Sequence, residues 1–308
     1  MRSARLLLFP VLVALPGLTA DFAGPVSGYV FEKESGSIRP INGFPGGSLL
    51  GSPVDLPVIL QSVVIRQAQN TAVGIVKESG AIVRITDITS TPEVSDHGGW
   101  LTKCNLVALS ATGDFGVAYS SAESKLVRFM NSDLQSSIGT AEYGEISVVA
   151  VEGTAVLFGT RDSLYRWVDN GITLLGRFED ISSVAFLNGG RDVAVADRAR
   201  NSLSMISDVS GSREVTLLAN EKEGINKPAA VCLGRDNRLL VANADSTAVV
   251  LDASSRSILA TIYLAAQPTR CEALNSNNLL LLNDVGPEPL VLVDLSEMAS
   301  FFVPVNQQ

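Results

Sequence analysis

The sequence predicts an all-β chain built from repeated four-stranded units. Six short apolar segments end in Asp or Asn at near-constant spacing, and within each repeat four apolar runs alternate with Gly, Asn, Asp and Ser. One repeat, for example, contains AAVCLG, NRLLVANA, TAVVLD and SILATIYL. The segments between these runs are too short for crossover helices, so consecutive strands are expected to be antiparallel. The closing residues are Asp87, Asn131, Asp169, Asp208, Asp252 and Asp294.

Four antiparallel strands in about 40 residues are typical of one blade of a β-propeller. Six complete repeats follow residue 57, and they favour a ring of six blades. A seven-bladed ring is the alternative, because the chain after residue 20 has room for seven repeats of about 41 residues. The recurring Asp or Asn is interpreted as a turn-former between the third and fourth strands, since its side chain accepts backbone N–H groups just beyond it.

Residues 1–20 have the layout of a cleavable signal peptide. Arg2 and Arg5 precede the apolar run LLLFPVLVAL, and Ala20 is a small residue at the expected cut. The apolar run is too short to span a bilayer, and no other segment reaches that length. We therefore expect a secreted or periplasmic chain, cut after Ala20, whose mature part is not inserted in a membrane.

Residues 21–56 are expected to hold an N-terminal hairpin and a Gly/Pro-rich loop. The segment 28–42, GYVFEKESGSIRPI, matches the third and fourth strands of the repeat AVVLDASSRSILATI. It lacks an inner pair of strands, so it is predicted to cover or clasp the ring closure between the first and last blades. The loop covers residues 44–57, and residues 57–308 form the propeller in one domain with the hairpin.

Two segments carry a resemblance to a known family. VAVADRARNSLSMI and LLVANADSTAVVLD resemble the repeats of bacterial propellers of the YVTN/NHL type, in which a second strand ends in Ala-Asp or Ala-Asn before a polar loop. The resemblance covers residues 57–306. It implies the propeller fold and a bacterial origin, and it assigns no activity.

Composition excludes several classes of function. The net charge of −9 argues against a nucleic-acid binder, and a single histidine excludes a multi-histidine metal site. We therefore predict a non-catalytic binding or scaffold module, expected to be a monomer, that meets a protein or small-molecule partner at a propeller face. A structural module of a larger envelope assembly is one alternative. No cofactor is favoured. If the protein is an enzyme, the sequence does not identify its catalytic residues.

A metal-assisted hydrolase of the lactonase type is the other alternative. The end of the second strand in successive repeats carries Ser120, Gly159, Asp197, Asn243 and Asn283. The oxygen side chains of Asp197, Asn243 and Asn283 suit a hard divalent cation, and they distantly resemble the metal sites of six-bladed lactonases. These three residues are the candidate ligands if a metal binds, although the interpretation without a metal is preferred.

The single histidine and the three cysteines are interpreted as structural. His97 stands in the loop SDHGGW, and no G-x-S-x-G elbow accompanies it, so it is expected to be an ordinary loop residue. Cys232 and Cys271 lie on the innermost strands of neighbouring repeats. They are predicted to be reduced and buried, since packed sheets lie about 10 Å apart. Cys104 is predicted to be free.

Overall fold

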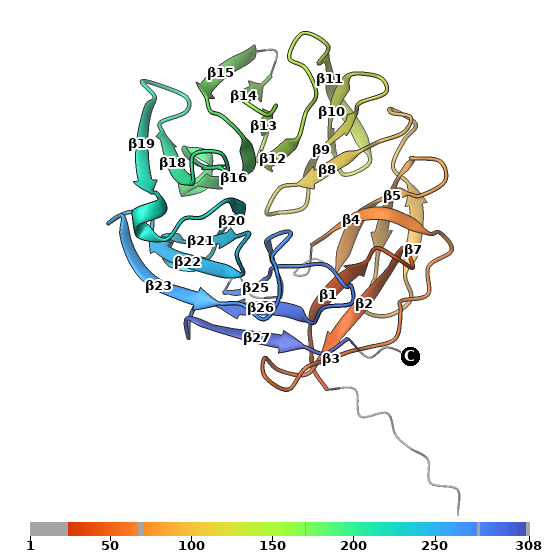
Figure 1. The fold of residues 1–308 in the computed structure, drawn as a ribbon. Helices are drawn as coiled ribbons and strands as arrows, with labels where there is room; N and C mark the ends of the chain where they lie inside the picture. Colours follow the sequence, from red (N-terminus) through yellow and green to blue (C-terminus); the bar gives the residue numbers. More distant parts are fainter. Residues whose placement is uncertain (1–23, 67–69, 170, 276–277, 306–308) are drawn as a thin grey trace, which may run out of the picture.

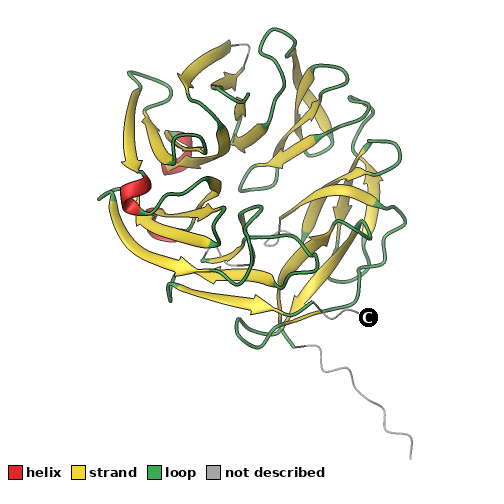
Figure 2. Cartoon of the chain, in the orientation of Figure 1, coloured by secondary structure: helices red, strands yellow, loops and turns green. Residues whose placement is uncertain are grey.

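In a computed structural model the chain forms a closed ring of seven β-sheets around a central channel (Figure 1). The structure describes residues 24–66, 70–169, 171–275 and 278–305, so the predicted signal peptide lies outside the described residues. The described part consists of strands and loops, with short 3-10 turns as its helical elements (Figure 2). None of its helices is both long and apolar enough to cross a membrane.

Six of the sheets are four-stranded antiparallel blades, in which each strand pairs with the next along the chain. Blade 1 contains β4 (Leu60–Arg66), β5 (Thr71–Val76), β6 (Ile82–Thr86) and β7 (Glu93–Asp96). Blade 2 contains β8 (Leu106–Leu109), β9 (Phe115–Ser120), β10 (Lys125–Met130) and β11 (Asp133–Gly139). Blade 3 contains β12 (Val148–Glu152), β13 (Ala155–Gly159), β14 (Ser163–Val168) and β15 (Gly171–Arg177).

The second half of the chain repeats this arrangement. Blade 4 contains β16 (Ile181–Leu187), β17 (Asp192–Asp197), β18 (Ser202–Ser207) and β19 (Glu214–Ala219). Blade 5 contains β20 (Pro228–Leu233), β21 (Arg238–Asn243), β22 (Thr247–Asp252) and β23 (Ser257–Tyr263). Blade 6 contains β24 (Glu272–Ala273), β25 (Leu279–Leu281), β26 (Leu290–Asp294) and β27 (Ala299–Val303). The predicted four-stranded antiparallel blade is confirmed.

The preference for six blades was wrong, because the N-terminal segment forms a seventh. This blade 7 is a three-stranded sheet of β1 (Val26–Glu32), β2 (Ser37–Asn42) and β3 (Leu49–Leu50), and β3 lies within the segment expected to be a loop. The hairpin does not cover the ring closure from outside but stands between blades 6 and 1. The physical reason is that both faces of the sheet are apolar, as in every other blade. Val30 packs toward blade 6, and Phe31 packs toward blade 1.

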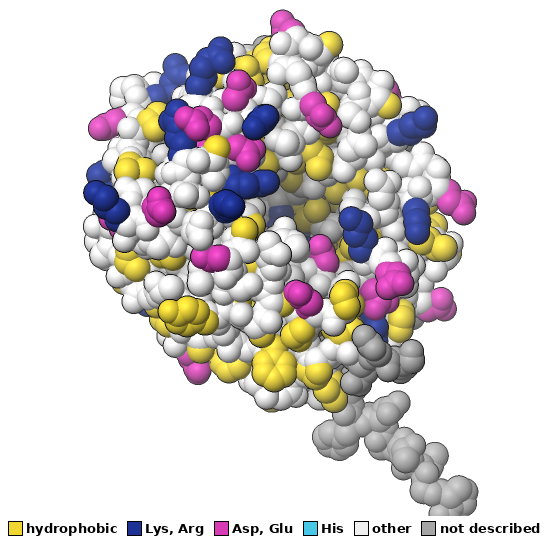
Figure 3. Space-filling model, in the orientation of Figure 1, with side chains coloured by type: hydrophobic (Ala, Val, Ile, Leu, Met, Phe, Trp, Pro, Cys, Tyr) yellow, Lys and Arg dark blue, Asp and Glu magenta, His cyan; other side chains and the backbone are white. Residues whose placement is uncertain are grey.

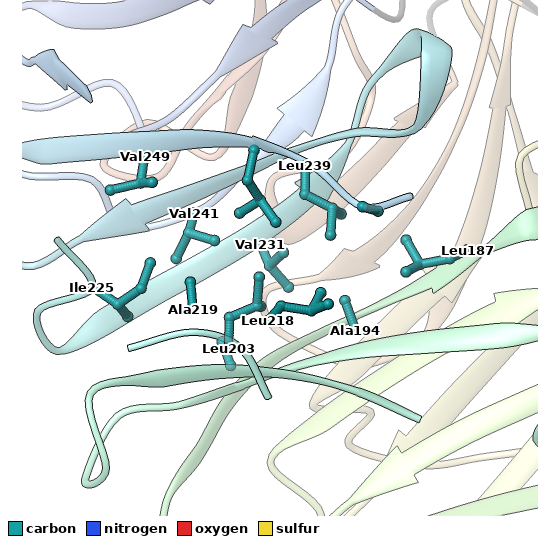
Figure 4. Close-up of a cluster of buried hydrophobic side chains, with 13 residues drawn as sticks. Leu187, Ala194, Leu203, Leu218, Ala219, Ile225, Val231, Leu239, Val241 and Val249 are labelled. Atoms are coloured by element: carbon teal, nitrogen blue, oxygen red, sulfur yellow. The ribbon is translucent and has the colours of Figure 1, made fainter. Parts of the chain in front are cut away.

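Seven hydrophobic clusters hold the ring together, one at each interface between neighbouring blades. In the cluster between blades 4 and 5, Ala194 and Leu203 face Val231, Leu239 and Val241 (Figure 4). A middle strand therefore buries both of its faces, which explains why these strands read as continuous apolar runs rather than alternating ones. Burial of apolar area between blades is the dominant stabilising term.

Arginine side chains add polar links across several of these interfaces. Arg128 in blade 2 donates to the carbonyl of Thr154 in blade 3 at 2.7 Å and lies 5.3 Å from the ring centre of Trp167. Arg238 in blade 5 donates to the carbonyl of Leu295 in blade 6 at 2.6 Å. A third link joins Arg84 in blade 1 to the turn after β10. Each guanidinium satisfies a backbone or amide acceptor that the blade itself leaves open.

The recurring Asp or Asn acts as a turn-former, as the sequence predicts. Asp87, Asn131, Asp169 and Asp208 adopt left-handed backbone angles, with φ of 54°, 52°, 50° and 49°. Asn and Asp tolerate this conformation better than other non-glycine residues. In blade 5, Asp252 instead accepts the backbone N–H groups of Ser254 and Ser255. The same residue type therefore closes the turn by two different local mechanisms.

A disulfide bond joins Cys232 to Cys271, so the prediction that both are reduced was wrong. The Cα atoms of the two residues lie 5.8 Å apart, within the range that a disulfide can bridge. The separation of about 10 Å between packed sheets does not apply here, because neighbouring blades converge where their innermost strands approach the ring axis. Cys104 is buried and free, as predicted.

Candidate functional site

The central channel widens into a cavity of about 420 Å³. Figure 3 shows the hollow at the centre of the ring, with acidic and basic side chains around its opening. Innermost strands of blades 1 to 6, with residues just beyond them, supply the described lining, and blade 7 contributes none of it. A cavity of this size is in the range of small-molecule sites in proteins.

The innermost strand of blade 6 bridges directly to blade 1 near the axis. The Glu272 carboxylate accepts the backbone N–H of Ile65 at 3.4 Å, although blade 7 stands between these two blades in the ring. Blade 7 therefore closes the ring farther from the axis, which agrees with the six innermost strands that the repeats predict.

Most of the side chains that line the cavity are apolar and two are charged, while polar atoms, including backbone groups, supply the larger share of its exposed surface. Among the described residues that line it, the charged ones are Arg66, at the end of β4, and Glu152, at the end of β12. Burial lowers the pKa of Arg66 to about 10, and the negative charge of Glu152 partly opposes this shift. The same lining carries no hydroxyl, imidazole or free thiol side chain.

The disulfide forms part of the wall across the channel. Cys232 and Cys271 both line the cavity, and they belong to blades 5 and 6. In a ring of seven blades, blades 5 and 6 stand opposite blade 2. Blade 2 lies between blade 1, which carries Arg66, and blade 3, which carries Glu152. The bond fixes the two innermost strands relative to each other, so the cavity is rigid on this side.

The structure places Asp197 in a structural role within blade 4. Its side chain is 1% exposed. Its two carboxylate oxygens accept the backbone N–H groups of Glu179 at 2.9 Å, Asp180 at 3.1 Å and Arg200 at 3.2 Å. Asp197 thereby fastens the loop that enters β16 to the end of β17.

Asn243 and Asn283 have matching roles in blades 5 and 6. Asn243 donates to the carbonyl of Gly224 and to the Thr247 hydroxyl, both at 2.9 Å, and accepts the backbone N–H of Asn226 at 3.1 Å. Asn283 accepts the backbone N–H of Val291 at 2.7 Å and donates to a carbonyl in its own blade. Each candidate ligand is therefore engaged inside its own blade, and the structure does not show the three gathered around one point.

The two remaining equivalent positions follow the same pattern. The Ser120 hydroxyl donates to the carbonyl of Thr102 at 2.7 Å, which fastens the loop entering blade 2. Gly159 ends β13, and its carbonyl accepts the backbone N–H of Ser147 at 2.8 Å. Within the described residues no group of three or more His, Cys, Asp or Glu side chains is arranged to hold a metal ion. The divalent-cation alternative stays a prediction.

His97 follows β7 in a loop, as predicted, but its ring is buried between blades 1 and 2. It is 1% exposed, and its ring centre lies 5.4 Å from that of Trp100 and 4.5 Å from that of Phe129. Both ring nitrogens lack a hydrogen-bond partner in the described structure. Burial lowers the pKa of His97 to about 4, with a smaller contribution from the charge of Arg84. The histidine is a neutral packing element here.

The candidate ligands predicted from the repeats lie at one end of the channel, and the cavity lies at the other end. Asp197 and Asn243 lie where the innermost strands of their blades begin, whereas Arg66 and Glu152 lie where such strands end. The signal that could have identified them is a charged residue closing an otherwise apolar innermost strand. VVAVE has this form, and in LQSVVIR the arginine follows three apolar residues.

Comparisons with known proteins support the fold. No protein-family model matches the chain, and no curated protein matches its sequence. A crystal structure of a functionally unknown protein from Desulfotomaculum acetoxidans is similar over 91% of this chain and 99% of that one, with a TM-score of 0.66 and 14% identity. The WD40 β-propeller domain of Doa1 is similar over 80% of this chain and 82% of that one, with a TM-score of 0.60 and 9% identity. At these identities the likeness shows the fold alone, and the chain is a seven-bladed β-propeller.

Proposed function

We propose that this chain is an exported, non-catalytic propeller that binds a small-molecule partner in its central channel. The observation that carries the proposal is the cavity of about 420 Å³, lined by mainly apolar side chains from six blades together with two charged side chains. Small-molecule sites have this composition, because the apolar wall supplies affinity and the polar groups supply orientation.

Export is supported by three features of the chain. Residues 1–20 have the charge and hydropathy pattern of a bacterial signal peptide, and the repeats resemble those of exported YVTN/NHL propellers. The disulfide between Cys232 and Cys271 belongs in an oxidising compartment. Expression of the full chain in a bacterium tests this directly. We expect a periplasmic protein whose mass corresponds to a chain starting at Asp21, and a cytoplasmic chain of full mass would contradict export.

Ligand retention tests the binding function. Protein purified under native conditions is analysed by native mass spectrometry for a bound small molecule. The variant Ala111→Trp places a large ring at an exposed position that lines the cavity, so it is expected to lose the bound mass. Ala122→Trp is the matched control, because Ala122 is an exposed turn residue outside the cavity lining. Equal ligand occupancy in both variants would show that the channel is not the site.

A further inference from the structure

The two charged side chains of the cavity do not neutralise each other by contact. Arg66 belongs to blade 1 and Glu152 to blade 3, and β8 of blade 2 lies between their strands. Within the described residues, no ion pair involves either of them. Opposite charges that face one cavity without touching leave space for a molecule that meets both.

The Arg66 side chain is largely, but not fully, shielded from water. Its Nε atom is buried and has no hydrogen-bond partner. A buried cation without a close counter-ion is costly, and that cost falls when an anion approaches. Arginine also presents several N–H donors in a planar fork that matches a carboxylate or a phosphate. Arg66 is therefore the anion-binding end of the cavity.

Gly190 in blade 4 lies beside the Glu152 side chain and leaves room for it. A Cβ atom added at Gly190 in blade 4 would lie 3.2 Å from Cγ of Glu152, so the absence of a side chain at Gly190 leaves room for the glutamate. Because Glu152 has no cation in contact, it provides the acceptor for a positively charged group. The remaining wall includes Leu109, Phe186 and Val231, which suit an apolar body.

We propose that the cavity binds a small zwitterion, with its anionic group on Arg66, its cationic group near Glu152 and an apolar body against the surrounding strands. This assignment rests on the proposed function and names its ligand class. A zwitterion pairs with both charged side chains at once. A molecule with a single charge leaves the other side chain unpaired, which costs affinity.

A series of ω-amino acids provides the probes, because each carries one carboxylate, one ammonium group and a methylene body. Calorimetry measures the binding of aminobutyrate, aminohexanoate and aminooctanoate to the mature protein. The singly charged counterparts are the carboxylate and the amine of each length: butyrate and butylamine, hexanoate and hexylamine, and octanoate and octylamine. We expect at least one member of the series to bind tenfold more tightly than the singly charged compound of equal length. Equal affinity for the zwitterion and its singly charged counterparts would overturn the assignment, and so would no binding by the whole series.

Two substitutions assign the charges to residues. Arg66→Gln should reduce the affinity for the zwitterion and for hexanoate at least tenfold, and should leave hexylamine unchanged. Glu152→Gln should reduce the affinity for the zwitterion to that of hexanoate. Arg161→Gln is the matched control, since Arg161 is exposed and lies outside the cavity lining. The thermal midpoint of each variant is measured alongside, and if a single variant does not fold, the charge-swapped double variant Arg66→Glu, Glu152→Arg replaces it. Unchanged selectivity in folded variants would overturn the assignment.

Failure of this assignment differs from failure of the proposed function. If the protein releases a bound molecule that Ala111→Trp lacks, but the ω-amino acids do not bind, the channel is a binding site and the zwitterion assignment is wrong. If no bound molecule is found and the tryptophan variant changes nothing, the channel function itself is wrong.

Discussion

Asp197 and His97 are both buried polar residues, but their surroundings differ completely. The oxygens of Asp197 accept three backbone N–H groups, while the ring nitrogens of His97 have no partner in the described structure. Asp197 stabilises the fold through these hydrogen bonds, which are shielded from water because its side chain is buried. His97 contributes packing and pays a penalty when protonated.

Replacing Asp197 with Ala is expected to destabilise the propeller by about 3 kcal/mol, because it leaves three backbone donors without their acceptor. Urea unfolding measures the change. Asp133→Ala is the control, since Asp133 is exposed at the start of β11 and its removal should cost far less. Equal stability of the two variants would show that the loop entering β16 does not need Asp197.

Stability is expected to fall as the pH drops from about 6.5 to about 4, because of His97. The pKa of His97 is lowered to about 4 in the folded protein, so between these values the unfolded chain binds a proton that the folded chain does not. The loss is at most about 3 kcal/mol. His97→Phe keeps an aromatic ring in the cluster and should flatten this pH dependence in urea unfolding curves. An unchanged slope in the variant would contradict the prediction.

At the scale of strands and blades, the innermost strands of neighbouring blades lie closer together than the sheets of a simple stack. Neighbouring blades converge toward the axis, so β20 and β24 come close enough for a disulfide, and Glu272 in β24 reaches the backbone of β4. The same convergence places the ends of β4 and β12 around one cavity. The proposed binding cavity and the disulfide therefore both lie where neighbouring innermost strands are closest together.

Removing the disulfide is expected to destabilise the protein by about 2–4 kcal/mol, since the bond closes a loop with a sequence separation of 39 residues. The double variant Cys232→Ala, Cys271→Ala is compared with the parent by thermal unfolding. Thiol titration of the parent in denaturant without reductant should find one thiol, which belongs to Cys104. Three titratable thiols under these conditions would show that the bond is absent.

Closure of the ring depends on blade 7, which has three strands and forms a sheet of its own. Apart from one isolated bridge between Glu32 and Val285, no strand pairing joins blade 7 to its neighbours in the described structure. The ring closes mainly by apolar packing on the two faces of blade 7. Closure is therefore sensitive to any loss of that sheet.

Deleting residues 24–55 should open the ring, because it exposes the apolar faces of blades 6 and 1 that blade 7 covers. We expect a lower thermal midpoint and self-association in size-exclusion chromatography. The control lacks residues 1–23 alone and should behave as the mature chain. A deletion variant that stays monomeric with an unchanged thermal midpoint would show blade 7 to be dispensable.

The sequence alone determined the blade, because strand and turn signals are local. Short apolar runs, the Gly-rich and Asx-rich turns between them and a period of about 40 residues all act within one repeat. They predicted the antiparallel four-stranded unit and the turn role of residues such as Asp252. The sequence also showed that segment 28–42 is a partial repeat.

Only the tertiary structure decided what these units do together. The partial repeat could form either a clasp or a blade. It is a blade because one face packs against blade 6 and the other against blade 1. The bond between Cys232 and Cys271 and the facing pair Arg66 and Glu152 depend on how closely the blades converge at the axis. These distances are set by the packing of the blades around the axis, and no local sequence pattern encodes them.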